Sequence, residues 1–347
     1  MPIVIAYGII ALAILAITYK TYVGYGKYRW YTKLSLLIIL ILGLSAPAIG
    51  IGFYGLSLPA YVLSLQKYLY LLFGFVIYLF VITFLRDIIW SIVDIIRRKS
   101  LHEMKDTAKL QTANLVTLIF CTLFCLYGFY EAEKDAAIVS YDIKSAKIKK
   151  PTKIVMLSDL HISPDVSVKY VENLVKRVNE LEADAIVLVG DIVDGEPHNL
   201  WAQMEALSQL KATEDVFVGL GNHEFYNGGL NWGIKFGHMG FEFLSNYGEK
   251  LEDRGIFIAG IPDINTATAA GMKVKTENAL YFASKDDYVI LLSHTPLIAD
   301  GVNKDNVDLQ LSAHTHGGQM YPFHYFVKQA NEGRIAGFYD VDGVKMY

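Results

Sequence analysis

The chain has 347 residues, of which 53% are hydrophobic, and the excess before residue 131 excludes a protein that is soluble throughout. Charge is divided unevenly, because residues 1–150 carry 16 Lys and Arg against 8 Asp and Glu, whereas residues 151–347 carry 15 against 27. A phosphate backbone binds basic surfaces, so we expect no nucleic-acid partner for the acidic second half.

Four apolar stretches in the first half are each long enough to cross the hydrocarbon core of a bilayer, which takes about 18 residues or more. They cover residues 2–19, 34–58, 61–85 and 113–130. The first lacks the basic start and cleavage site of a signal peptide, so we expect a retained helix. The second contains Pro47 and four glycines, which leaves a bent or re-entrant course as an alternative. Residues 1–130 are therefore predicted to be an all-α transmembrane region of about four helices.

Lysine and arginine are concentrated in two of the connecting segments. The segment between the first two stretches holds four of them and the segment between the last two holds six, whereas the opposite side holds only Lys67. Basic loops stay in the cytoplasm, so the count predicts an integral protein of the cell membrane whose second half is extracytoplasmic. Residues 86–99 place apolar and charged positions on opposite faces, and we expect a separate helix on the inner membrane surface.

The chain changes character after the fourth stretch. Residues 131–150 are polar and weakly patterned, which predicts a linker that keeps the following domain near the bilayer. From residue 151 to 347, short apolar runs alternate with amphipathic segments, as is typical of an α/β domain. Strands are expected at 153–158, 185–189, 216–220, 256–259, 288–292 and 309–312, and helices at 165–183 and 199–211.

Five short segments that end or directly follow these apolar runs carry nearly all the pairs of histidine and acid. They are Asp159-Leu160-His161, Gly190-Asp191-Ile192-Val193-Asp194, Gly221-Asn222-His223-Glu224, Ser293-His294 and His314-Thr315-His316. Strands of a parallel or mixed sheet end along a common edge, so these side chains are expected to converge. Carboxylates and imidazoles at close range need a compensating cation, which predicts a metal centre with two ions rather than one. One such segment alone would indicate only a turn or a strand-end hydrogen bond.

In their order, these segments resemble the signature of the calcineurin-like metallophosphoesterases, and residues 314–319 are similar to a membrane-associated bacterial branch of that family. The resemblance covers residues 153–316 and implies a four-layer α/β sandwich with a dinuclear site. Ala313 stands where the family usually has Gly, which could shift the His314 backbone without loss of a ligand. Relatives usually continue beyond the position of Tyr347, so an incomplete sheet edge is expected.

Carried over position by position, the resemblance implies a set of seven metal ligands. Asp159, His161 and His316 would hold one ion, Asn222, His294 and His314 would hold the other, and Asp191 would bridge the two. Carboxylate, imidazole and amide ligands without a thiolate suit two divalent ions such as Mn, Fe or Zn. The two ions would share a hydroxide that attacks phosphorus and would stabilise the attacking and leaving oxygens.

Two further residues are expected to act in catalysis. The resemblance implies that His223 is no ligand and protonates the leaving oxygen. Asp194 resembles the family residue that hydrogen-bonds this histidine and raises its pKa, although a turn residue before Gly195 is the alternative. We expect no catalytic role for Glu224 or for the histidines at 198, 238 and 324.

The sequence thus predicts a membrane-anchored, metal-dependent phosphoric ester hydrolase, a phosphatase or phosphodiesterase. Its catalytic domain would stay close to membrane lipid, where lipid-linked or other cell-envelope phosphate esters are accessible substrates. The alternative is a non-catalytic metal-binding sensor or scaffold at the membrane, which the complete set of ligand positions disfavours. A channel or transporter is disfavoured because the apolar stretches hold almost no charged residues.

Overall fold

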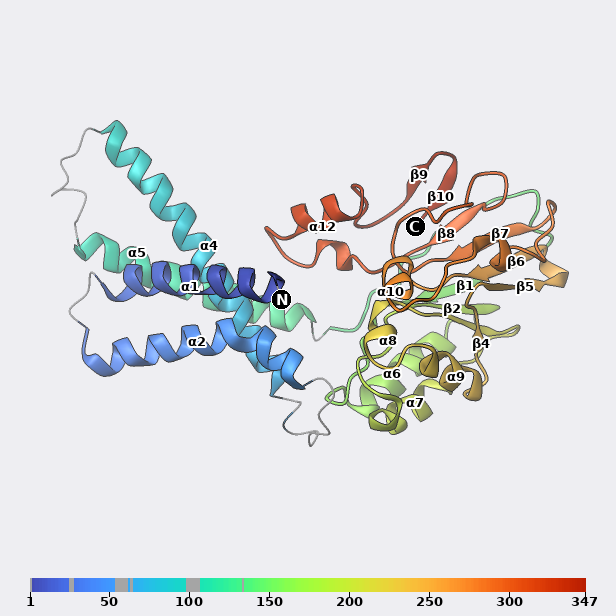
Figure 1. Ribbon diagram of the computed structural model, residues 1–347, viewed down its shortest axis with the longest axis horizontal. Coiled ribbons are helices and arrows are strands. Elements are labelled where there is room, and N and C mark those ends of the chain that lie inside the picture. The colour runs from blue at the N-terminus through green and yellow to red at the C-terminus, as the bar shows by residue number, and fades with distance from the viewer. Residues whose placement is uncertain (1, 25–27, 54–61, 63–64, 98–106, 133) are drawn as a thin grey trace. The chain divides into compact units, whose positions relative to one another are not determined.

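The computed structural model describes residues 2–24, 28–53, 62, 65–97, 107–132 and 134–347. The chain divides into two compact units, Met1–Ser140 and Tyr141–Tyr347 (Figure 1). Within the described residues, the first unit holds four long helices: α1 (Pro2–Val23), α2 (Trp30–Phe53), α4 (Gln66–Ile96) and α5 (Thr107–Ala132). All four are long and apolar enough to cross a membrane, in agreement with the sequence. Residues 54–58 of the second expected stretch and 61, 63 and 64 of the third lie outside the described residues.

Helix α2 runs through Pro47 to Phe53 without a re-entrant turn. Two of its glycines lie where α4 comes close. A Cβ atom on Gly43 would lie 2.7 Å from a methyl group of Val76, and one on Gly50 would collide with the Tyr70 hydroxyl. Small residues at such positions let two membrane helices approach closely. Gly43 and Gly50, two of the four glycines that left the course of this stretch open, therefore serve helix packing.

The prediction of a separate helix from residue 86 is wrong, because α4 continues unbroken to Ile96. No glycine or proline follows Gly74 in this helix, so nothing in the sequence ends it at residue 86. Its 31 residues span about 46 Å, more than the roughly 30 Å of a hydrocarbon core. The charged stretch from Arg86 accounts for the surplus length.

The second unit is built on two sheets. The first is parallel and runs in the order β1 (Ile154–Leu157), β2 (Ala185–Val189), β3 (Val216–Gly219), β4 (Glu242–Phe243). The second runs in the order β5 (Tyr247–Leu251), β6 (Ile256–Gly260), β7 (Tyr288–Leu292), β8 (Leu309–Leu311), β10 (Val344–Met346), β9 (Tyr339–Val341). Its four central strands are parallel, and the two edge strands are antiparallel to their neighbours.

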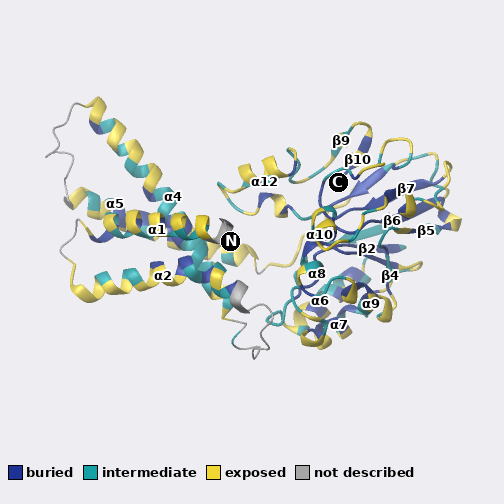
Figure 2. Cartoon of the chain, viewed as in Figure 1, coloured by how far each residue is buried: buried dark blue, intermediate teal, exposed yellow. Residues whose placement is uncertain are grey.

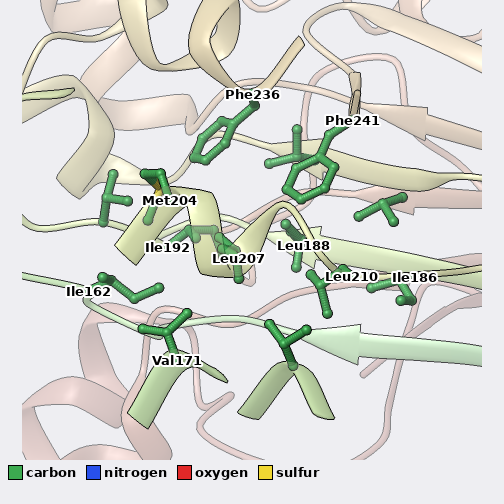
Figure 3. Close-up of a cluster of buried hydrophobic side chains, with 14 of the residues drawn as sticks. Ile162, Val171, Ile186, Leu188, Ile192, Met204, Leu207, Leu210, Phe236 and Phe241 are labelled. Carbon is green, nitrogen blue, oxygen red and sulfur yellow. The ribbon is translucent and has the colours of Figure 1, made fainter. Parts of the chain in front are cut away.

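Alternation along β2 shows how the layers are held together. Ile186 and Leu188 face a core that they share with α6 (Val168–Asn179), α7 (Trp201–Leu207) and α9 (Leu230–His238), drawn in Figure 3. Ala185, Val187 and Val189, which alternate with them along β2, face the second sheet. The outer side of that sheet packs against α10 (Ile264–Ala269) and α11 (Thr276–Ala279). The domain is therefore a four-layer α/β sandwich, as the sequence predicts, and Figure 2 shows the central strands of both sheets buried.

The segment before the first strand belongs partly to the second unit. Ile143 and Ile148 pack against the core between the two sheets. Lys147 forms an ion pair with Asp308 at 2.8 Å. The stretch between the end of α5 and the start of the second unit is therefore residues 133–140, which is shorter than the linker expected at 131–150.

Candidate metal centre

The predicted ligands lie at the carboxyl ends of five parallel strands. Asp159 and His161 follow β1, Asp191 follows β2, Asn222 follows β3, His294 follows β7, and His314 and His316 follow β8. All five strands that precede them agree with the sequence expectation to within one residue at each end, and β2 and β7 agree at both ends. The common strand edge thus brings together side chains that are up to 157 residues apart in the sequence.

These side chains form two groups. In the first, one ligand atom each of Asp159, His161 and His316 lie within 4.8 Å of one another. Nε2 of His161 faces Nε2 of His316 at 3.1 Å. In the second group, ligand atoms of Asp191, His294 and His314 lie within the same limit.

Asp191 lies between the two groups. Its Oδ2 atom is 3.0 Å from Nε2 of His294 and 4.0 Å from Nε2 of His161. Asp159 also approaches both, with Oδ1 3.6 Å from Nε2 of His316 and 4.0 Å from Nε2 of His294. One carboxylate oxygen of Asp191 therefore has a nitrogen of each group within reach.

Among the described residues, the buried Oδ1 of Asn222 has no hydrogen-bond partner, and the buried Nε2 of His294 faces the Asp191 carboxylate at 3.0 Å. Nδ1 of His294 lies 2.8 Å from the carbonyl oxygen of Val189, to which it donates. This bond directs the lone pair of the neutral ring to Nε2. A buried amide oxygen without a partner, and a buried imidazole nitrogen that faces a carboxylate, are groups that a bound cation would satisfy. The donor set therefore fits a divalent metal ion.

The backbone is strained at the same residues. Among the described residues, ten other than glycine have a positive φ, and five of these are predicted ligands: Asp159 (51°), His161 (45°), Asp191 (53°), His314 (70°) and His316 (47°). Side chains disfavour this region, and such strain gathers at functional sites. Ala313 does not have a positive φ, so its backbone conformation accommodates the methyl group without strain. The methyl group therefore gives no reason for the shift of the His314 backbone that the sequence suggested.

Glu224, to which the sequence analysis gave no role, holds two of the ligand loops together. It is fully buried, and its carboxylate accepts hydrogen bonds from the backbone N–H groups of Asp191 (3.0 Å), Ile192 (2.7 Å), Val193 (3.1 Å) and Gly221 (2.8 Å). Burial and the charge of Asp191 raise the pKa of Glu224, whereas the N–H groups favour its ionised form. The only sequence signal for this role was its place directly after Asn222 and His223.

Asp194 contacts two histidines. Its Oδ1 atom accepts a short hydrogen bond from Nδ1 of His223, and Oδ2 lies 3.0 Å from Nδ1 of His161. Burial raises the pKa of Asp194, but the two histidines outweigh burial and hold it well below its usual range. Burial lowers the pKa of His223, and the bond to Asp194 reverses this, so that the pKa is raised.

The other histidines show how a cation would fit. Burial disfavours a charged His294, but the adjacent Asp191 raises the pKa of His294 to about 9. Burial lowers the pKa of His314 and of His316, so both rings are neutral at pH 7 and keep a lone pair. Metal ligands must be deprotonated, and a cation at Nε2 of His294 would replace its proton.

The comparisons with known proteins agree with this geometry. Residues 152–318 match the sequence model of the calcineurin-like phosphoesterases. The chain is 39% identical over 191 residues to an uncharacterized metallophosphoesterase of Aquifex aeolicus, with 53% of this chain and 71% of the relative covered. The chain belongs to the calcineurin-like metallophosphoesterase family.

Two other relatives are similar over longer stretches of the chain. An uncharacterized metallophosphoesterase of Campylobacter jejuni is 31% identical over 236 residues, with 67% of this chain and 62% of the relative covered. A transmembrane protein with metallophosphoesterase domain of Danio rerio is 31% identical over 222 residues, with 60% and 51% covered. The chain thus matches less than two thirds of the length of either relative.

Proposed function

We propose that the chain is a membrane-anchored phosphoesterase with a dinuclear metal centre that hydrolyses phosphate mono- or diesters. Lipid-linked and other cell-envelope phosphates are the substrates that an anchored site would reach. The observation that carries the proposal is the position of Asp191 Oδ2, which lies within 4.0 Å of a ring nitrogen in each of the two ligand groups. A carboxylate in that position suits a bridge between two ions.

The seven ligands divide between the ions as the two groups do. Asp159, His161 and His316 would hold one ion, Asn222, His294 and His314 would hold the other, and Asp191 would belong to both. Bound divalent ions such as Mn, Fe or Zn would polarise the phosphoryl group and supply a nucleophile at neutral pH. The strained backbone of five of these residues keeps their side chains aimed at the site before any ion binds.

His223 is placed to donate a proton. Its Nδ1 is bonded to Asp194, so the ring is held with Nε2 toward the site, 3.9 Å from Oδ2 of Asp191. The side chain is 26% exposed, so a substrate can reach it. A histidine oriented in this way protonates a leaving oxygen, and Asp194 stabilises the charged ring before the transfer.

The variant Asp191→Asn tests the bridge. An amide oxygen is a weaker ligand than a carboxylate, so both ions should bind more weakly and hydrolysis of aryl phosphates should be lost. The full-length variant is purified in detergent, its metal content is measured, and turnover is compared with wild type. Asp165→Asn, at a carboxylate that accepts a hydrogen bond from Ser163 and lies outside both ligand groups, is the matched control. Two ions per chain together with full turnover in Asp191→Asn would contradict the bridge.

A further inference from the structure

An aromatic segment, residues 321–338, follows the last metal-ligand loop and includes α12 (His324–Ala330). Five of its rings are exposed: Tyr321 (68%), Phe323 (42%), Tyr325 (66%), Phe326 (67%) and Phe338 (44%). Figure 1 shows α12 standing out from the two sheets, and Figure 2 shows most of its surface exposed. Soluble domains seldom expose so many apolar groups together, and such patches mark protein or membrane contacts.

Both ends of the aromatic segment are held against the loop that carries His314 and His316. A Cβ atom on Gly318 would lie 2.6 Å from Cβ of His324, so α12 begins in contact with this loop. Near the other end, the Thr315 hydroxyl donates to the carbonyl oxygen of Ile335 at 2.7 Å. The segment that carries the exposed rings therefore begins and ends against the loop that holds the predicted ligands His314 and His316.

The tether from the membrane helices reaches the domain at the same segment. Tyr141, the first residue of the second unit, packs against Phe338 with ring centroids 4.8 Å apart. Residues 133–140 can extend about 28 Å at most, at about 3.5 Å per residue. The end of the aromatic segment therefore packs against the residue at which this tether enters the domain.

We infer that the aromatic segment inserts its rings into the headgroup layer of the bilayer that the chain's own helices span. Tyrosine suits this layer because its ring is apolar and its hydroxyl stays in water. The net charge of the domain does not favour this contact, since residues 151–347 carry 27 Asp and Glu against 15 Lys and Arg. The exposed rings therefore supply the main attraction, beside the basic Lys328 in the last turn of α12.

This contact narrows the substrate class of the metal centre. A site held beside the headgroup layer would receive phosphoesters of lipid headgroups, and this step rests on the proposed function. The membrane contact itself does not depend on hydrolysis. Binding and activity can therefore be tested separately.

The contact is tested with a fluorophore on the full-length chain. Phe326→Cys is labelled with an environment-sensitive dye, in a background with Cys121→Ala and Cys125→Ala, and the protein is reconstituted into phosphatidylcholine and phosphatidylglycerol vesicles. Tyr325→Cys is a second labelling position. The control is Asp253→Cys, because the Asp253 side chain is 89% exposed in the turn after β5.

The dye at 326 should be quenched by lipids that carry a spin label on the upper acyl chain and shielded from iodide, whereas the dye at 253 should show the reverse. Equal quenching at the two positions would overturn the inference. Shielding of position 326 from both quenchers would indicate a protein partner or a second copy, which also overturns it.

Activity separates this inference from the proposed function. The double variant Tyr325→Ser and Phe326→Ser should keep turnover of a soluble aryl phosphate. Its turnover of a headgroup phosphoester in vesicles should fall at least tenfold, because the loss of one well-buried ring alone is expected to cost about a factor of ten. Tyr170→Ser, on an exposed tyrosine of α6, is the control. Equal turnover of the vesicle substrate by the double variant and the wild type would contradict the substrate class. A wild type inactive on both substrates would contradict the proposed function, and the dye experiment would still test the membrane contact.

Discussion

Asp194 orients two histidines to which the proposed function gives different tasks. Bonds from its carboxylate to Nδ1 of His161 and Nδ1 of His223 turn Nε2 of both rings toward Asp191. His161 Nε2 also faces Nε2 of His316 at 3.1 Å, whereas His223 groups with His161 and Asp194. In the proposed function, one carboxylate would thus orient both a metal ligand and a proton donor.

His223→Ala should separate these two tasks. Turnover of poor leaving groups should fall by roughly 10²–10⁴, the usual contribution of general acid–base catalysis. The loss should be smaller for nitrophenyl esters, whose leaving oxygen hardly needs a proton, and metal content should stay at the wild-type level. Turnover with a series of leaving groups and metal analysis measure both effects. His238→Ala, exposed at the end of α9, is the control. Loss of metal, or equal losses for all leaving groups, would exclude the acid role.

Glu224→Gln should weaken the framework of the site. The amide NH₂ would face backbone N–H groups that now donate to a carboxylate oxygen. A buried donor without an acceptor costs about 1–3 kcal/mol, so the free energy of unfolding should fall by that amount and metal affinity should fall too. Denaturant unfolding and metal titration of the full-length chain measure these quantities. Glu205→Gln, exposed on α7, is the control, and equal stability of the two variants would show that Glu224 has no such role.

The turn after β3 shows how an element depends on one small residue. A side chain on Gly221 would collide with the Asp191 carboxylate, which is hydrogen-bonded to the backbone N–H of His223. Gly221→Ala should therefore displace Asp191 and reduce both metal content and turnover. Gly237→Ala in α9 meets nothing within 4 Å and should instead stabilise the domain by up to about 1 kcal/mol. Thermal unfolding and metal analysis distinguish the two, and normal metal binding by Gly221→Ala would contradict this account.

Central strands were predictable because their sequences are continuous buried apolar runs, such as Ala185–Val189 and Tyr288–Leu292. The strands β4, β5, β9 and β10 were missed since they are short or mix polar and apolar residues. Helix α6 begins later than expected because the Ser167 side chain caps it by accepting from the N–H of Tyr170. Local sequence signals thus define the central strands of the two sheets but not their edge strands.

The convergence of the ligand segments was predictable for the same reason, since each follows a recognisable strand. Glu224 was not predictable, because its importance lies in backbone N–H groups about 30 residues earlier in the chain. The contact of Asp194 with His161 likewise depends on how two loops fold together. Spacing in the sequence identifies the ligand residues of a site, whereas the residues that hold these ligands in place follow from the tertiary structure.

For the whole molecule, the asymmetry of lysine and arginine predicts that the metallophosphoesterase domain is extracytoplasmic. A cysteine at the exposed position 253 should then react with an impermeant maleimide in intact cells. Thr32→Cys, near the first basic loop, should react only after lysis. Both variants use the background without Cys121 and Cys125. Labelling of position 253 only after lysis would reverse the orientation.

The need for two ions tests the central claim most directly. Metal-free full-length protein is titrated with Mn²⁺, and binding and turnover of an aryl phosphate are measured on the same sample. Because Asp191 lies between both ligand groups, activity should stay low through the first equivalent and rise to its maximum as the second binds. Full turnover at one bound ion per chain, or no turnover with two ions bound, would contradict a dinuclear phosphoesterase.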